Sequence, residues 1–319
     1  MEIPADRPLT RLGLLLSNPL ANGVAAHDAD QGMGGEVEGV LSGVVDLAAA
    51  VERAGFDSLW VSDSIGTDEA EIPAVPVETG RNGLRYEAYS LLGALAVHTA
   101  SLSLGALPLR ADARAPSVLA KIVTTIDVLS HGRSIITLGT SPSFDRVDVQ
   151  RLAEAIRVCR AVLNDVDPEF VGSFYEIHGA INRPPPVHSG GIPIAVFVNS
   201  EGPSWSDALE VAARSADAVV VGGDEAAVDR AAEFLRSIAY AEVPWSPAVP
   251  VIWSGPLLAD RPQCSSELPM ELLDALGEIE GRIDAGADGC IISIDSTDQL
   301  GMILEAGPML LDALGRPRL

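Results

Sequence analysis

Asp63 is the residue best placed to take part in chemistry. It closes a strand-length apolar run, Asp57 to Asp63, and precedes a long connecting segment. If that run is a strand of a barrel, its last residue lies at the end where barrel enzymes build their sites. A carboxylate there can accept a hydrogen bond or a proton from a bound molecule. Capping of a loop or a helix is the alternative use of Asp63, and we favour the site.

The histidines and clustered acids do not predict a metal site. His98 and His131 fall before the third and fourth expected strands, on the scaffold side, which indicates structural roles. His27, beside Asp28 and Asp30, could reach the site, but a solvated loop histidine is the interpretation that we prefer. A further acidic loop lacks converging histidines or carboxylates at the spacing of a metal site, so we predict a solvated face. Its acids are Asp68, Glu69, Glu71 and Glu78.

Charge and composition exclude several kinds of partner. The 319 residues include 45 acidic and 21 basic side chains, a formal charge of −24, and Lys121 is the one lysine. Nucleic acids and anionic membranes are bound by clustered cations, which this chain lacks. Three scattered cysteines predict neither a disulfide framework nor a zinc cluster; they are Cys159, Cys264 and Cys290. No apolar run approaches the roughly 20 residues that span a bilayer. We expect a cytoplasmic protein whose partner is a small molecule.

Strand-length apolar runs alternate with helical segments along the whole chain. Because several runs are continuously apolar, they are typical of parallel strands covered by helices. The eight expected strands are Arg11–Ser17, Asp57–Asp63, Ser101–Leu107, Ser134–Thr140, Ile192–Val198, Ala216–Gly222, Pro247–Ser254 and Asp288–Ile294. The eight expected helices are Glu36–Ala54, Tyr86–Ala100, Ala115–Ser130, Asp148–Asn164, Ser204–Ser215, Asp224–Ala241, Pro269–Ala285 and Thr297–Leu314. Unbroken alternation predicts an α/β fold, a single (β/α)8 barrel of TIM type over residues 1–319, with an open doubly wound sheet as the alternative.

Three connections are longer than barrels need: residues 18–36, 64–85 and 255–268. All three follow strands, so they fall on the face where such barrels hold their sites, and long loops there are often lids or interface arms. Residues 165–191 form another long stretch, on the opposite side, and their Phe-Tyr-Glu-Ile predicts a small hairpin. Trp60 lies in mid-strand and is predicted to be core, whereas Trp253 ends a strand and could wall a pocket.

The most specific motif begins at Arg114. The segment Arg-Ala-Pro-Ser-Val-Leu-Ala-Lys-Ile-Val-Thr-Thr-Ile-Asp-Val-Leu-Ser-His-Gly-Arg ends at Arg133. It follows the line R-x-P-x-x-x-A-K-x-x-x-T-x-D-x-L-S-x-G-R of the bacterial luciferase-like flavin and F420-dependent oxidoreductases. Ala-Gly-Phe-Asp-Ser-Leu-Trp-Val-Ser-Asp at 54–63 resembles the second strand of the same family. The resemblance extends from about residue 11 to residue 314, and it also implies the barrel.

The resemblance implies F420 or FMN lying across the carboxyl ends of the strands. Its activity would be hydride transfer or monooxygenation of a small organic substrate, in a protein that is commonly a homodimer. Matched residue by residue, the catalytic positions are Asp63 and Ser64. The cofactor-binding positions are Ala106, Leu107, Gly139, Thr140, Ser141, Val198, Asn199, Ser200 and Gly202.

Several residues depart from the family pattern. Ser64 stands where many relatives carry a histidine, and both Gly139-Thr-Ser and Asn199-Ser200 replace glycine-rich turns. Glycine matters in such turns because a phosphate needs close approach to the backbone. A polyanion such as F420 would also need arginines to converge on it, and the candidates are Arg110, Arg114 and Arg146. The alternative function is therefore a barrel without redox activity that acts as a binding or partner protein.

Overall fold

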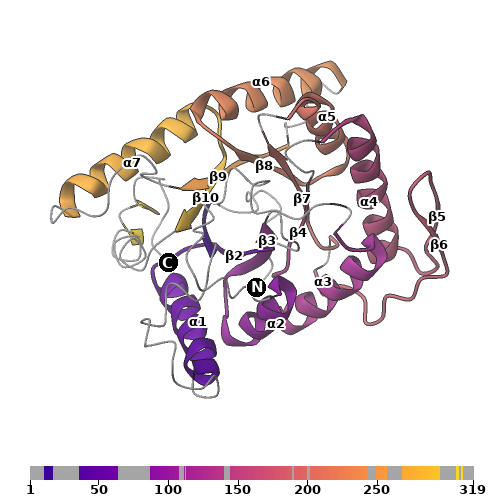
Figure 1. Cartoon of the computed structure of the whole chain (residues 1–319), viewed down its shortest axis with the longest axis horizontal. Helices are drawn as coiled ribbons and strands as arrows, with labels where there is room; N and C mark the ends of the chain where they lie inside the picture. Colours follow the sequence, from indigo (N-terminus) through magenta and orange to yellow (C-terminus); the bar gives the residue numbers. More distant parts are fainter. Residues whose placement is uncertain are drawn as a thin grey trace.

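The computed structural model of the chain contains a barrel of parallel strands surrounded by helices (Figure 1). It describes residues 11–16, 36–63, 87–107, 111, 113–139, 144–188, 190–199, 202–242, 249–256, 268–294, 307–308 and 310–311. The barrel strands are β1 (Leu12–Leu16), β2 (Ser58–Ser62), β3 (Ser103–Leu107), β4 (Ile136–Gly139), β7 (Ile194–Asn199), β8 (Ala218–Gly222), β9 (Val251–Pro256) and β10 (Gly289–Ile294). All eight strands predicted from the sequence are confirmed.

Parallel pairing joins the strands in the order β3-β2-β1-β10-β9-β8-β7-β4. The two ends of this sheet meet through a parallel bridge between Leu104 and Ser134. Two backbone hydrogen bonds support the bridge, from the Leu104 N–H to the Arg133 carbonyl and from the Ile135 N–H to the Leu104 carbonyl. The sheet is therefore a nearly closed barrel, and the predicted (β/α)8 fold is confirmed over the open alternative.

The helices form the outer ring, as Figure 1 shows. They are α1 (Glu36–Arg53), α2 (Ala88–His98), α3 (Pro116–Ser130), α4 (Arg146–Asn164), α5 (Trp205–Ser215), α6 (Glu225–Glu242) and α7 (Leu268–Asp284). These seven match predicted helices. Of the eighth, predicted over Thr297–Leu314, the structure describes residues 307–308 and 310–311, which are helical. Apart from their ends, the three long connections lie outside the described residues.

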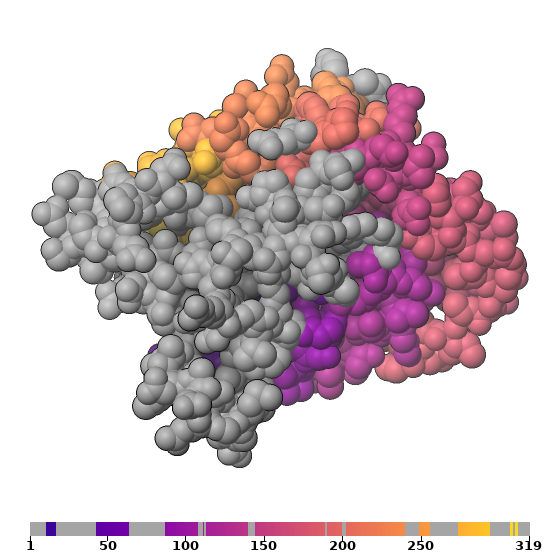
Figure 2. Space-filling view, viewed as in Figure 1, coloured from indigo at the N-terminus to yellow at the C-terminus, as the bar shows by residue number. Residues whose placement is uncertain are grey.

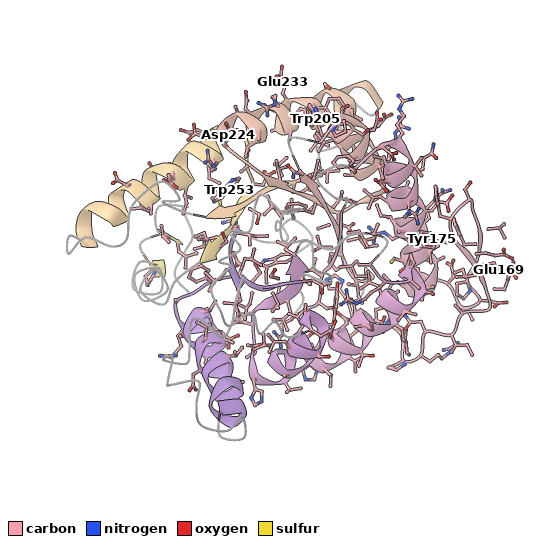
Figure 3. All side chains as sticks on the ribbon, in the orientation of Figure 1. Glu169, Tyr175, Trp205, Asp224, Glu233 and Trp253 are labelled. Atoms are coloured by element: carbon pink, nitrogen blue, oxygen red, sulfur yellow. The ribbon has the colours of Figure 1, made fainter. Side chains whose placement is uncertain are left out.

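A small hairpin projects beyond α4, at the right of Figures 1 and 2. Its antiparallel strands are β5 (Glu169–Val171) and β6 (Glu176–His178), so the predicted hairpin is confirmed. The buried carboxylate of Glu154 on α4 holds the hairpin tip by accepting three backbone N–H groups. Figure 3 labels Tyr175 at this contact. The donors are Ser173 at 2.7 Å, Phe174 at 2.8 Å and Tyr175 at 3.3 Å.

Three aspartates fix the amino-terminal ends of the strands. Asp57, Asp217 and Asp288 each stand just before a strand and accept the N–H of the first residues of a neighbouring one. Asp57 accepts from Arg11 and Leu12 at 3.0 and 3.1 Å. The first N–H groups of a barrel strand have no ladder partner there, so these carboxylates satisfy them.

Trp60 fills the barrel interior, which confirms its predicted place in the core. It is fully buried, and its indole N–H donates to the Ser58 hydroxyl at 2.8 Å. Gly13 and Gly105 provide the space for the ring, since a Cβ on either one would lie within 3 Å of it. A large side chain against two glycines is an efficient way to fill a narrow barrel.

Candidate active site

The inward-facing residues near the carboxyl ends of the strands are mostly small or polar. Alternation along each strand identifies them, because Trp60, Phe197, Val220, Ile252 and Ile291 belong to the interior cluster and residues two positions later face the same way. These later positions, together with the last residue of β4, are Ser62, Gly139, Asn199, Gly222, Ser254 and Ser293. Leu107 on β3 is the large apolar exception. This end of the barrel therefore offers hydrogen-bonding groups and little bulk.

Among the residues that the structure describes, two hydroxyl groups inside the barrel have no hydrogen-bond partner. The Thr137 Oγ1 and the Ser293 Oγ are both buried, on β4 and β10 respectively. A buried hydroxyl without a partner is costly, and such groups in native proteins commonly serve a ligand or an ordered water. They fit a site that takes a polar molecule.

Asp63 directly follows β2, at the same end of the barrel, but alternation along the strand places it on the face opposite to Ser62, toward the helices. Its N–H donates to the Leu107 carbonyl at 2.9 Å, which fixes it against the end of β3. Its side chain is only 2% exposed. Arg114 holds the carboxylate with two parallel hydrogen bonds, Nη1 to Oδ2 at 2.5 Å and Nη2 to Oδ1 at 3.1 Å. Paired bonds of this kind fix the orientation of a carboxylate as well as its position.

Arg114 has two further partners on α2 and its cap. Its Nη2 donates to the Oε1 of Glu87 at 2.6 Å, and its guanidinium lies 4.7 Å from the ring centre of Tyr89. Glu87 is also the N-cap of α2, since its Oε2 accepts the Ser90 N–H at 2.7 Å. The network thus joins the end of β2, the start of α2 and the residue two places before α3.

Burial and ion pairing act in opposite directions on the pKa values of this network. Burial raises the pKa of Asp63 above its usual value, while the hydrogen bonds and charge of Arg114 oppose that rise. Burial also acts to raise the pKa of Glu87, but hydrogen bonds from Ser90 and the charge of Arg114 outweigh it, so the pKa is lowered. Burial would lower the pKa of Arg114, but Asp63 and Glu87 raise it overall.

Only some of the other predicted site residues face the interior of the barrel. Leu107, Gly139 and Asn199 lie at inward-facing positions. Ala106 and Val198 belong to the outer cluster, so only their backbone could contact a molecule at the mouth of the barrel. The remaining predicted positions Ser64, Thr140, Ser141 and Ser200 lie outside the described residues.

The space into which a side chain at position 202 would point is already filled by another residue. A Cβ there would lie 2.2 Å from the Phe144 ring, which is fully buried. The Gly202 N–H donates to the Asn199 carbonyl at 3.4 Å. Close packing against Phe144 therefore accounts for a glycine at this position without any ligand.

The helix starts around the site differ in how they are capped. Carboxylates cap α2, α4 and α6 through Glu87, Asp145 and Asp224, and α4 has a full capping box with Asp148. The N-cap of α5, Ser204, makes no side-chain hydrogen bond. Because the first N–H groups of a helix attract anions, the start of α5 suits a phosphate better than a start capped by a carboxylate, although Asp207 stands in its first turn and contacts Arg146.

Two expectations about arginines and tryptophan need correction. Arg114 and Arg146 were candidates for binding an anionic cofactor, but Arg114 is paired with two carboxylates, and Arg146 contacts Asp207 at 3.4 Å. Arg110 lies outside the described residues. Trp253 does not wall a pocket, because it packs outward in the helix-facing cluster. Its indole N–H donates to the Gly223 carbonyl at 2.8 Å, and Figure 3 labels it near α7.

The long motif that begins at Arg114 proves to be largely a framework. Arg133 is buried and donates to carbonyl oxygens of Ala96, Thr99, Leu102 and Ser130. Asp127 accepts from the Ser134 hydroxyl and from the N–H groups of Val187 and His188. Arg114 is the motif residue that reaches the site.

Glu87 was missed as a site residue from the sequence. The available signal was that the loops after neighbouring parallel strands lie side by side, and that a carboxylate and an arginine end these two loops, just before α2 and α3.

Among the residues that the structure describes, no three histidine, cysteine or acidic side chains gather as a metal site would need. No helix in the described ranges is long and apolar enough to cross a membrane.

Comparison with known proteins gives consistent matches. The family model of luciferase-like monooxygenases matches residues 22–263. An F420-dependent glucose-6-phosphate dehydrogenase of Kineococcus radiotolerans is 27% identical over 172 residues, which are 50% of this chain and 47% of that protein. A 5,10-methylenetetrahydromethanopterin reductase of Archaeoglobus fulgidus is 25% identical over 178 residues, 53% of this chain and 46% of the relative. The chain thus spans about half the length of these curated relatives.

Solved structures match over more of the chain. An F420-dependent secondary alcohol dehydrogenase in complex with an F420-acetone adduct gives a TM-score of 0.67 at 14% identity, covering 94% of this chain and 99% of its own. A long-chain alkane monooxygenase gives a TM-score of 0.68 at 15% identity, covering 97% and 92%. At these identities the likeness shows the barrel fold.

Proposed function

The chain belongs to the luciferase-like monooxygenase family, and on that premise we propose that it is an oxidoreductase that uses F420 or FMN. Its reaction would be hydride transfer to, or monooxygenation of, a small organic substrate. The observation that carries the proposal is the small and polar lining of the carboxyl end of the barrel, where the Ser293 hydroxyl has no hydrogen-bond partner among the described residues. Barrels of this kind place their ligands at that end.

The residues present fit a flavin-type cofactor. The ring would lie over Leu107, Gly139 and Asn199, with the backbone of Ala106 and Val198 and with Thr140, Ser141, Ser200 and Gly202 as the remaining proposed contacts. The start of α5 would take a phosphate, because no carboxylate caps it. When bound, the cofactor supplies the redox chemistry, while the protein supplies orientation and electrostatics.

Asp63 and Ser64 are the proposed catalytic residues. Asp63 offers a carboxylate oriented by Arg114 at the end of β2, and a ligand that reached its remaining lone pairs would donate a hydrogen bond to it. Ser64 stands next to it and would supply a hydroxyl where many relatives carry an imidazole. A hydroxyl can donate and accept but does not titrate near neutral pH. A proton that an imidazole would donate or accept at this position would therefore have to be donated or accepted by the substrate or the cofactor.

Charge bears on which cofactor is bound. Arg114 and Arg146 already contact carboxylates, and the chain carries a formal charge of −24. This balance favours the less anionic FMN, whereas the curated relatives named above are an F420-dependent enzyme and a reductase. Titration of the protein with each cofactor, followed by cofactor and tryptophan fluorescence, decides between them. Saturable binding of one at micromolar concentration or tighter supports the proposal.

A variant pair ties any binding to the barrel mouth. Ser293→Leu places a larger apolar side chain at the inward end of β10, so we expect at least a tenfold loss of cofactor affinity. Ser237→Leu, at an exposed position of α6, is the matched control and should bind as the natural protein does. Equal affinity in the two variants would place the cofactor elsewhere and overturn this site.

The second candidate function is a binding or partner protein without redox activity. Two contacts favour it: Asp63 pairs with Arg114, and Phe144 packs over Gly202. Each gives a predicted site residue a structural role that needs no ligand. Absence of binding by both F420 and FMN in the titration would favour this candidate. A pull-down with the whole chain would then identify its partner.

We also propose that the protein is a homodimer in the cytoplasm. Helix α2 is apolar almost all round, and Val97 on it is 57% exposed. Because an apolar helix face is normally covered, we assign a second copy of this chain to it. Val97→Glu should convert the dimer into a monomer in light scattering after size exclusion. A natural protein that is already monomeric would refute the assignment.

A further inference from the structure

We propose that the β5–β6 hairpin is a positioning element of the candidate site, and that Tyr175 at its tip is the positioning residue through which it acts. The hydroxyl of Tyr175 holds the connection between β3 and α3 against the end of β4, where the proposed cofactor would lie. Of this connection, here called the β3–α3 segment, the structure describes residues 111 and 113–115. The inference deepens the proposed function, and its consequence for ligand affinity rests on that function.

The hairpin reaches toward the carboxyl end of the barrel although it starts from the opposite end. Helix α4 follows β4, so it runs away from the carboxyl end and finishes at Asn164. The hairpin tip returns along the helix to Glu154, which lies ten residues, or about 15 Å, before that finish. Two arginines of α4 also lie over aromatic rings of the hairpin: Arg157 over Phe170 at 5.1 Å and Arg151 over Phe174 at 4.8 Å. These contacts fasten the hairpin along α4.

At the tip, the side chain of Tyr175 joins the hairpin to the mouth of the barrel. Its hydroxyl donates to the Ala111 carbonyl at 3.1 Å, between residues that are 64 positions apart in the chain. The N–H of Ala111 in turn donates to the Gly139 carbonyl at 2.9 Å. Gly139 is the last residue of β4 and holds an inward-facing position. A single buried residue, Ala111, therefore connects the hairpin to a strand end of the candidate site.

The β3–α3 segment is placed by tertiary contacts, because it ends without a side-chain cap. Ala115, the N-cap of α3, makes no side-chain hydrogen bond, and Pro116 after it has no N–H to donate. On one side of the segment Arg114 binds Asp63, next to the end of β2, at 2.5 Å. On the other side Ala111 has the two bonds described above. The segment thus bridges the ends of β2 and β4, which flank β3 in the barrel.

The hydroxyl of Tyr175, and not its ring, gives the residue this role. The ring packs against the core beside Phe170 and Ile177, and a phenylalanine would fill the same space. The hydroxyl adds the bond to the Ala111 carbonyl, and a buried carbonyl that loses its donor is destabilised. Without that bond the β3–α3 segment is freer to move relative to the end of β4. A ligand site must be held to within about 0.5 Å by its supporting contacts, so this movement should weaken binding.

Tyr175→Phe tests the role, because it removes the hydroxyl and keeps the ring. Native-state amide hydrogen exchange at Ala111 measures the bond between its N–H and Gly139. We expect this exchange to quicken about tenfold, as for the loss of one buried hydrogen bond. Thr125→Val is the matched control, since it removes an exposed hydroxyl on α3 that donates to the Lys121 carbonyl, also at 3.1 Å. It should leave exchange at Ala111 as in the natural protein. Unchanged exchange at Ala111 in Tyr175→Phe would overturn the inference.

Cofactor affinity distinguishes a positioning role from a purely structural one. Measured where every variant is fully folded, the dissociation constant for F420 or FMN should rise roughly fivefold to tenfold in Tyr175→Phe and stay unchanged in Thr125→Val. Quicker exchange at Ala111 with unchanged affinity would show that the hydroxyl supports the fold without positioning the site. The positioning role would then be wrong, and the proposed function would stand.

Glu154→Gln covers the case in which Tyr175→Phe does not fold. It loosens the hairpin tip from α4 and leaves Tyr175 in place, so exchange at Ala111 should quicken and cofactor affinity should fall, each by about twofold or more. If both values match those of the natural protein, the hairpin does not act on the site. If neither F420 nor FMN binds the natural protein, the proposed function fails and the effect on affinity falls with it. Quicker exchange at Ala111 in Tyr175→Phe would still uphold the anchoring.

Discussion

Replacing Glu154 by glutamine should loosen the β5–β6 hairpin and do so in a pH-dependent way. The carboxylate accepts the N–H groups of Ser173, Phe174 and Tyr175 at 2.7, 2.8 and 3.3 Å. Hydrogen bonds to a charged group contribute about 1.5–3 kcal/mol each, and an amide oxygen retains part of this. We expect Glu154→Gln to lower the free energy of unfolding by roughly 1–2 kcal/mol.

The sign of the pH dependence follows from the direction of the pKa shift. Burial acts to raise the pKa of Glu154, but the three backbone hydrogen bonds and the charge of Arg157 lower it overall. A lowered folded-state pKa stabilises the protein above the pKa of the unfolded chain, and this stability is lost as pH falls through the folded value. The difference between the natural protein and Glu154→Gln should therefore be full at pH 7 and shrink below about pH 4.5.

Urea unfolding at pH 7 and pH 3.5, with amide hydrogen exchange of the hairpin tip, measures both effects. Glu210→Gln on α5 is the control, since its exposed pair with Arg214 should be worth no more than about 0.5 kcal/mol. Exchange at the tip should quicken in Glu154→Gln and stay unchanged in the control. A loss below 0.5 kcal/mol without faster exchange at the tip would show that the carboxylate does not hold the hairpin.

Four further predictions concern the framework and the site, each measured by urea unfolding. Gly105→Ala should cost about 2 kcal/mol or more, because its Cβ would lie 2.3 Å from the Trp60 ring. Gly277→Ala, in an open position of α7, should instead stabilise by up to about 1 kcal/mol. Arg133→Met should cost roughly 3 kcal/mol, because buried carbonyl oxygens lose their donor. Glu87→Gln should change stability by less than about 1 kcal/mol, since its side chain is 45% exposed. A large loss in Gly277→Ala, or none in Gly105→Ala or Arg133→Met, would contradict the packing described.

Local patterns in the sequence were sufficient for the elements of the fold. Strand-length apolar runs and helical spacing depend on neighbouring residues, so all eight strands and seven of the helices were predicted within a few residues. Strict alternation of the two then limits the topology, because parallel neighbours need a helix between them. The motif from 114 to 133 could be recognised for the same reason. Its residues begin, end and anchor a single helix, α3, between two strands.

Two features of the candidate site depended on the tertiary structure. Strands buried on both faces read as continuous apolar runs, so the sequence could not say that Trp60 faces the interior and Trp253 the helices. Arg114 and Asp63 are 51 residues apart, and each has other carboxylates or arginines closer in the chain. The register of β2 beside β3 brings them together. Charge pairing is set by which loops become neighbours, and that is decided when the barrel closes.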